Sequence, residues 1–82
     1  MATPAVPPPT PPPSVAWDAG DLGCSDLVLE LRMRFRELPV GTVLELTARD
    51  AGAPEDLPAW CRMTGQKLLS SQHPRYRIRK EV

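Results

Sequence analysis

The distribution of proline limits where this chain can fold. The first fourteen residues read MATPAVPPPTPPPS, hold seven of the eleven prolines and carry no charged side chain. Proline has no backbone N–H and its ring fixes φ, so this stretch can neither fill a sheet ladder nor continue a helix. We therefore expect residues 1–14 to form a disordered or polyproline tail and residues 15–82 to form one small domain.

Hydrophobic periodicity within residues 15–82 predicts both helices and strands. The clearest helix spans 25–38 and contains no proline or glycine. Five apolar residues fall on one side of it at helical spacing: Leu27, Val28, Leu31, Phe35 and Leu38. Alternating apolar and polar side chains predict a half-buried strand over 42–49. A second helix is expected over 55–64, because prolines and acids occupy its start and Gly65 follows its end.

The remaining segments complete a sheet. A short strand is expected over 15–19, and a closing hairpin over 67–72 and 75–80 turns at His73-Pro74. The order β-α-β-α-β-β predicts an α/β fold, a two-layer sandwich in which a mixed four-stranded sheet carries both helices on one face. The other face is expected to be open to water.

Charge and hydropathy exclude several classes of function. Ten basic side chains balance ten acidic ones, so no global field favours nucleic acid, although the arginines of the last strand would suit phosphate groups. No apolar run reaches the length of a membrane span, and the proline-rich start lacks the order of a signal peptide. We therefore expect a cytoplasmic monomer with no membrane association.

The two cysteines are expected to be free thiols in a reducing compartment. They are not spaced as metal ligands and only one histidine is present, so we expect no metal site. Cys24 lies at the predicted start of the first helix, where unpaired N–H groups and the helix dipole favour an anionic, nucleophilic thiolate. The position fits a small packing residue equally well. Asp26 would oppose the thiolate, and Ser25 or Asp26 could cap the helix instead.

Three segments of the chain resemble the TusA/SirA family of sulfur carriers. The run WDAGDLGC, residues 17–24, is similar to the family's entry motif, and DAGAPEDLPAWC, residues 50–61, is similar to its second motif. Gly65-Gln66-Lys67-Leu68 resembles the opening of the family's third strand. The resemblance covers residues 15–82, but the family's Cys-Pro-x-Pro signature is replaced by Cys24-Ser25-Asp26-Leu27, without either proline.

The resemblance implies a sulfurtransferase that works as a sulfur carrier, with Cys24 as the catalytic residue and no cofactor. A donor such as a cysteine desulfurase or a rhodanese would load Cys24 with sulfane sulfur as a persulfide, and a downstream acceptor protein would receive it. The family's destinations are tRNA thiolation, molybdenum cofactor assembly and sulfur oxidation. The missing prolines favour an alternative, a non-catalytic interaction or regulatory module on the same fold.

Other residues are candidates for supporting roles. Asp50 could orient the loop near Cys24 or form an Asx turn, and the sequence does not choose between the two. Leu29 and Met33 lie on the outward side of the first helix and are candidates for docking a partner protein. Cys61 could serve as a second, resolving thiol, but we expect it to be a buried structural residue.

Overall fold

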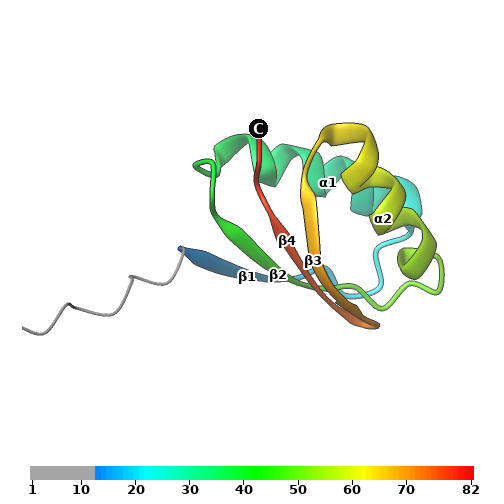
Figure 1. The fold of residues 1–82 in the computed structure, drawn as a ribbon. Coiled ribbons are helices and arrows are strands. Elements are labelled where there is room, and N and C mark those ends of the chain that lie inside the picture. Colours follow the sequence, from blue (N-terminus) through cyan, green and yellow to red (C-terminus); the bar gives the residue numbers. More distant parts are fainter. Residues whose placement is uncertain (1–12) are drawn as a thin grey trace, which may run out of the picture.

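The computed structural model describes residues 13–82, so residues 1–12 of the tail expected over residues 1–14 lie outside the described residues. Ser14, the last residue assigned to that tail, is the first residue of a strand. The order is β1 (Ser14–Asp18), α1 (Cys24–Glu37), β2 (Val43–Thr47), α2 (Ala53–Thr64), β3 (Lys67–Gln72) and β4 (Arg75–Arg79). Both helices stack along one side of the sheet (Figure 1). The predicted two-layer α/β sandwich is confirmed.

The sheet is mixed, with strand order β1-β2-β4-β3. β1 runs parallel to β2, as the crossover through α1 requires, and β4 is antiparallel to both of its neighbours. The register sets Trp17 against Leu46 and Leu46 against Tyr76, so their side chains point to the face that the helices cover. The alternate residues, Glu45 and Arg77 among them, point to the open face.

The core fills the space between the sheet and the helices. From α1 it takes Leu27, Leu31 and Phe35, three of the five residues that the helical spacing predicted. The other two, Val28 and Leu38, are only partly buried. Phe35 meets Trp60 of α2 edge to face, with ring centroids 5.2 Å apart, and this contact joins the two helices over the sheet. Buried residues of the strands complete the core: Leu44, Leu46, Tyr76 and Ile78.

Five of the six elements have an end displaced by one or two residues from its predicted position. β2 ends at Thr47 rather than at residue 49, because the N–H groups of Ala48 and Arg49 bond to Pro74 and Gly20 in neighbouring loops. α2 begins at Ala53, since Pro54 is well suited to a first helical turn. It ends as predicted at Thr64, before Gly65, whose φ of +78° is left-handed.

Lys80, just beyond β4, closes the far end of α1. Its Nζ donates to the carbonyl oxygens of Phe35 at 2.6 Å and Leu38 at 2.7 Å. Phe35 lies in the last turn of the helix, where its carbonyl also accepts the Leu38 N–H at 3.2 Å, and Leu38 is the C-cap. The helix dipole favours a cation at this end. The segment after β4 is thus bonded to the end of α1 through Lys80.

We predict that Lys80→Met lowers the free energy of unfolding by about 1–2 kcal/mol, because two charge-assisted hydrogen bonds are lost while the aliphatic stem is kept. Urea unfolding followed by tryptophan fluorescence measures the change. Lys67→Met, which removes an exposed lysine from β3, is the matched control. Equal effects of the two substitutions would contradict a capping role for Lys80.

Candidate functional site

Cys24 is the first residue of α1. Gly23 forms the N-cap in an extended conformation, φ −70° and ψ 167°, and its carbonyl accepts the Leu27 N–H at 2.8 Å. Glycine offers no side chain to the N–H groups of the first turn, and no side-chain cap bond is present at this end of the helix within residues 13–82. The backbone around Cys24 therefore retains donors that favour an anion.

Ser25 and Asp26 follow in the first turn of α1, and both are exposed. The sequence allowed either of them to cap the helix, but the N-cap position falls on Gly23. A residue inside the helical turn lies past the cap, because the N-cap must itself be non-helical. The helix still begins at Cys24 although the two family prolines are absent.

An ion pair fixes the loop that leads from β1 to Cys24. Asp18 accepts bonds from both terminal nitrogens of Arg49, at 2.9 and 3.2 Å, and from the Gly20 N–H at 2.8 Å. The Arg49 N–H in turn donates to the Gly20 carbonyl at 3.1 Å. Residues 18–20 are thus bonded to Arg49, which follows β2. These bonds fix the start of the loop that leads to α1.

The Asp18–Arg49 pair also changes the ionisation of both groups. The hydrogen bond from Arg49 lowers the pKa of the Asp18 carboxyl, and the Gly20 N–H lowers it further. The same bond, which Asp18 accepts, raises the pKa of Arg49. Asp18 therefore remains ionised throughout the neutral range. The pair is exposed to water, so its contribution is to loop geometry more than to stability.

Asp50 organises the turn into α2. Its Oδ2 accepts the Gly52 N–H at 3.0 Å and its carbonyl accepts the Ala53 N–H at 3.1 Å. This is the Asx-type arrangement, one of the two roles that the sequence left open. A Cβ at position 52 would lie 2.9 Å from an oxygen of Asp56 and 3.0 Å from Oδ2 of Asp50, so a larger residue there would displace these two side chains.

Leu29 and Met33 lie on the solvent side of α1. Their exposed fractions are 58% and 55%, high values for large apolar side chains. Residues four apart on a helix are neighbours on its surface, so the two form one apolar strip that begins about one turn after Cys24. Leu27 and Leu31, on the other side of the helix, are fully buried.

Cys61 lies in the core on α2, with 3% of its surface exposed. Burial raises the pKa of its thiol to about 11, so the thiol is protonated and unreactive at neutral pH. Within residues 13–82, no cluster of three or more His, Cys, Asp or Glu side chains could hold a metal ion. No helix of this part of the chain is long and apolar enough to cross a membrane.

The structure thus gathers some of the predicted site residues and separates others. Cys24, Ser25 and Asp26 share the first turn of α1, whereas Asp50 serves the entrance of α2. The link between the two loops, the Asp18–Arg49 pair, was not predicted. A signal was present in the sequence, since Asp18 ends β1, Arg49 follows the neighbouring β2, and the two residues carry opposite charges.

Comparisons with known proteins agree on one family. The family model described as "Sulfurtransferase TusA" matches residues 17–80. The sulfur carrier protein TusA of Pseudomonas putida (strain GB-1) is 33% identical over 74 residues, which cover 85% of this chain and 92% of that protein. TusA of Pseudomonas entomophila is 37% identical over 69 residues, covering 79% and 86% of the two chains.

A longer relative also matches. The putative sulfur carrier protein YrkF of Bacillus subtilis is 34% identical over 59 residues, which are 72% of this chain. The matched region is only 32% of YrkF, so this chain spans about a third of that relative's length.

We predict that Cys61 resists alkylation in the folded protein. In a Cys24→Ser variant, iodoacetamide should label Cys61 slowly at pH 9, because its pKa of about 11 keeps the thiol protonated there. Labelling should speed up in denaturant, where the thiol returns to its ordinary pKa near 9.0 and is exposed. Mass spectrometry measures the rates, and equal rates in the folded and unfolded protein would contradict the burial of this thiol.

Proposed function

Because the chain belongs to the TusA family of sulfur carriers, we propose that it accepts sulfane sulfur as a persulfide on Cys24 and relays it to an acceptor protein. The observation that supports this proposal best is the position of Cys24 as the first residue of α1, after a glycine N-cap. A thiolate or persulfide anion at that position is stabilised by the dipole and by the N–H groups of the first turn.

The proposed transfer needs no redox partner. The Cys24 thiolate attacks the outer sulfur of a donor persulfide, an S–S bond forms to Cys24, and the donor's S–S bond breaks to release the donor thiolate. In the second step the thiolate of the acceptor attacks the outer sulfur on Cys24, and Cys24 leaves as a thiolate. One sulfur atom moves in each step, and the proton it carries moves with it or is exchanged with water.

The change from Pro-x-Pro to Ser25-Asp26-Leu27 has two opposing effects in this proposal. Serine keeps the backbone N–H that proline lacks, so the first turn of α1 offers one more donor to the sulfur. Asp26 places a negative charge in the same turn, which disfavours the thiolate. The first effect supports transfer, and the second would slow it by reducing the thiolate fraction.

A second candidate function rests on the same substitution. Without the two prolines the chain could be a non-catalytic interaction or regulatory module on the sulfur-carrier fold. Sulfur loading of Cys24 separates the two candidates, because only a carrier gains sulfur.

The donor in this proposal is a cysteine desulfurase or a rhodanese, and the sulfur goes to tRNA thiolation, molybdenum cofactor assembly or sulfur oxidation. We propose a cytoplasmic protein, since these donors work on reduced thiols. Leu29 and Met33 are proposed to dock the partner: they are exposed, apolar and on the same helix as Cys24.

We predict that the reduced chain gains one or more sulfur atoms when it is incubated with a persulfide donor, namely a cysteine desulfurase with L-cysteine. Intact mass spectrometry measures the gain, which reductant should reverse. Cys61→Ser should gain sulfur like the wild type and Cys24→Ser should not. Absence of an adduct on Cys24, with a rhodanese and thiosulfate also tried, would favour the interaction module instead.

We also predict that Leu29→Asp combined with Met33→Asp slows sulfur transfer from the desulfurase about tenfold or more, because charges would be desolvated on docking. Alkylation of Cys24 by iodoacetamide should be unchanged, since a small reagent needs no docking surface. Met63→Asp is the matched control, because Met63 is an exposed methionine of α2, with 85% of its surface accessible. A similar slowing by Met63→Asp would argue against the α1 strip.

A further inference from the structure

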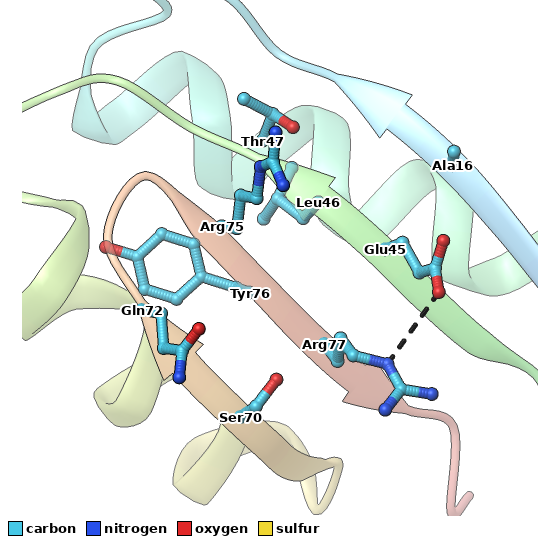
Figure 2. A pocket seen from close by; sticks show the side chains of 9 residues that line it. All are labelled: Ala16, Glu45, Leu46, Thr47, Ser70, Gln72, Arg75, Tyr76 and Arg77. Atoms are coloured by element: carbon cyan, nitrogen blue, oxygen red, sulfur yellow. Dashed lines mark ion pairs between the residues drawn. The ribbon is translucent and has the colours of Figure 1, made fainter.

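The open face of the sheet is hollowed at the end near the β3–β4 turn (Figure 2). The hollow has a volume of about 410 Å³ and lies over β2, β4 and β3. Its lining includes six charged or polar side chains of the open face, Glu45, Thr47, Ser70, Gln72, Arg75 and Arg77, together with the buried Tyr76. The hollow lies on the side of the sheet that the helices leave uncovered. It is therefore separate from the hydrophobic core and from the helix that carries Cys24.

The sheet register arranges these side chains in two rows. In one row Arg77 lies between Glu45 of β2 and Ser70 of β3. In the next row Arg75 lies between Thr47 of β2 and Gln72 of β3. Two positions along a strand are about 6.6 Å apart, so the two guanidinium groups share one small region of the face.

This region carries more positive than negative charge. Arg77 is paired with Glu45, but at 3.8 Å the contact is a loose one (Figure 2). Within residues 13–82, Arg75 forms no salt bridge, and its direct neighbours Thr47 and Gln72 are uncharged. The acid next along that row, Asp18, is already engaged by Arg49 and by the Gly20 N–H.

We propose that this hollow binds the oxyanion group, phosphate or carboxylate, of a small molecule, with Arg75 as its principal ligand and Arg77 as the second. A guanidinium presents a planar fork of donors that matches both groups. The hydroxyls of Thr47 and Ser70 and the amide of Gln72 supply further donors around the same space. An anion there would also offset the repulsion between two cations held side by side.

A small ligand fits this site better than a nucleic acid does. The volume falls in the range of small-molecule sites. Single-stranded RNA is bound through bases that stack on exposed aromatic rings, and this face has none. Phe35, Trp60 and Tyr76 are buried, and Trp17 lies on the helix side beneath the guanidinium of Arg34. The balanced net charge provides no field that would attract a polyanion.

The test uses the full chain carrying Cys24→Ser, so that binding is measured apart from sulfur chemistry. Amide chemical shifts are followed while inorganic pyrophosphate, and separately citrate, is added; the two arms distinguish phosphate from carboxylate. Shifts should concentrate on β2, β4 and β3 around the hollow. Arg75→Gln should weaken binding about tenfold or more. Glu45→Gln should strengthen it about threefold, because Arg77 is released and a competing carboxylate is removed.

Arg62→Gln is the control, since it removes an exposed arginine from α2 on the other layer of the molecule. An equal loss with Arg62→Gln would overturn the proposal, because it would indicate binding to surface charge in general. Shifts confined to other regions, or no shifts with either anion, would also overturn it. Tighter binding of an RNA oligomer or an acidic peptide through Arg75 would assign the face to a macromolecule instead.

Discussion

The parallel pairing of β1 with β2 is the constraint on which the rest of this structure depends. Because the two strands point the same way, the chain must return across the sheet through α1, and the start of that helix follows the end of β1. Five residues separate Asp18 from Cys24. The bonds that Arg49 and the Gly20 N–H donate to Asp18 fix the start of this connection. The position of the cysteine is therefore a consequence of strand pairing, completed by one ion pair at the strand ends.

The two ends of α1 differ in whether a side chain bonds to the terminal backbone groups, and this difference suits the proposed chemistry. The C-terminal carbonyls are closed by the ammonium group of Lys80, so the negative end of the dipole is neutralised. At the N-terminal end Gly23 contributes no side chain, and the positive end is left for whatever anion residue 24 can provide. A serine or aspartate at position 23 would satisfy these donors itself and would compete with a thiolate.

The fold could be predicted from sequence because local and global signals agree. The spacing of Leu27, Leu31 and Phe35 identified the buried side of α1, and Gly65 marked the end of α2. The burial of Val43 was not anticipated, because alternation placed it with Glu45; it lies on a central strand between Ser14 and Arg79 and is covered despite facing away from the helices. Alternation reports the direction of a side chain, and neighbouring strands decide its exposure.

The site was harder to predict than the fold, since its geometry depends on contacts between distant segments. Asp18 and Arg49 are 31 positions apart, and only the register of β1 against β2 brings them together. The grouping of Arg75 and Arg77 with Thr47 and Gln72 likewise needs the strand order, in which β4 lies between β2 and β3. Alternation alone put the arginines on the open face. The order of the strands surrounded Arg75 with uncharged donors, and this is what turns a basic strand into a candidate anion site.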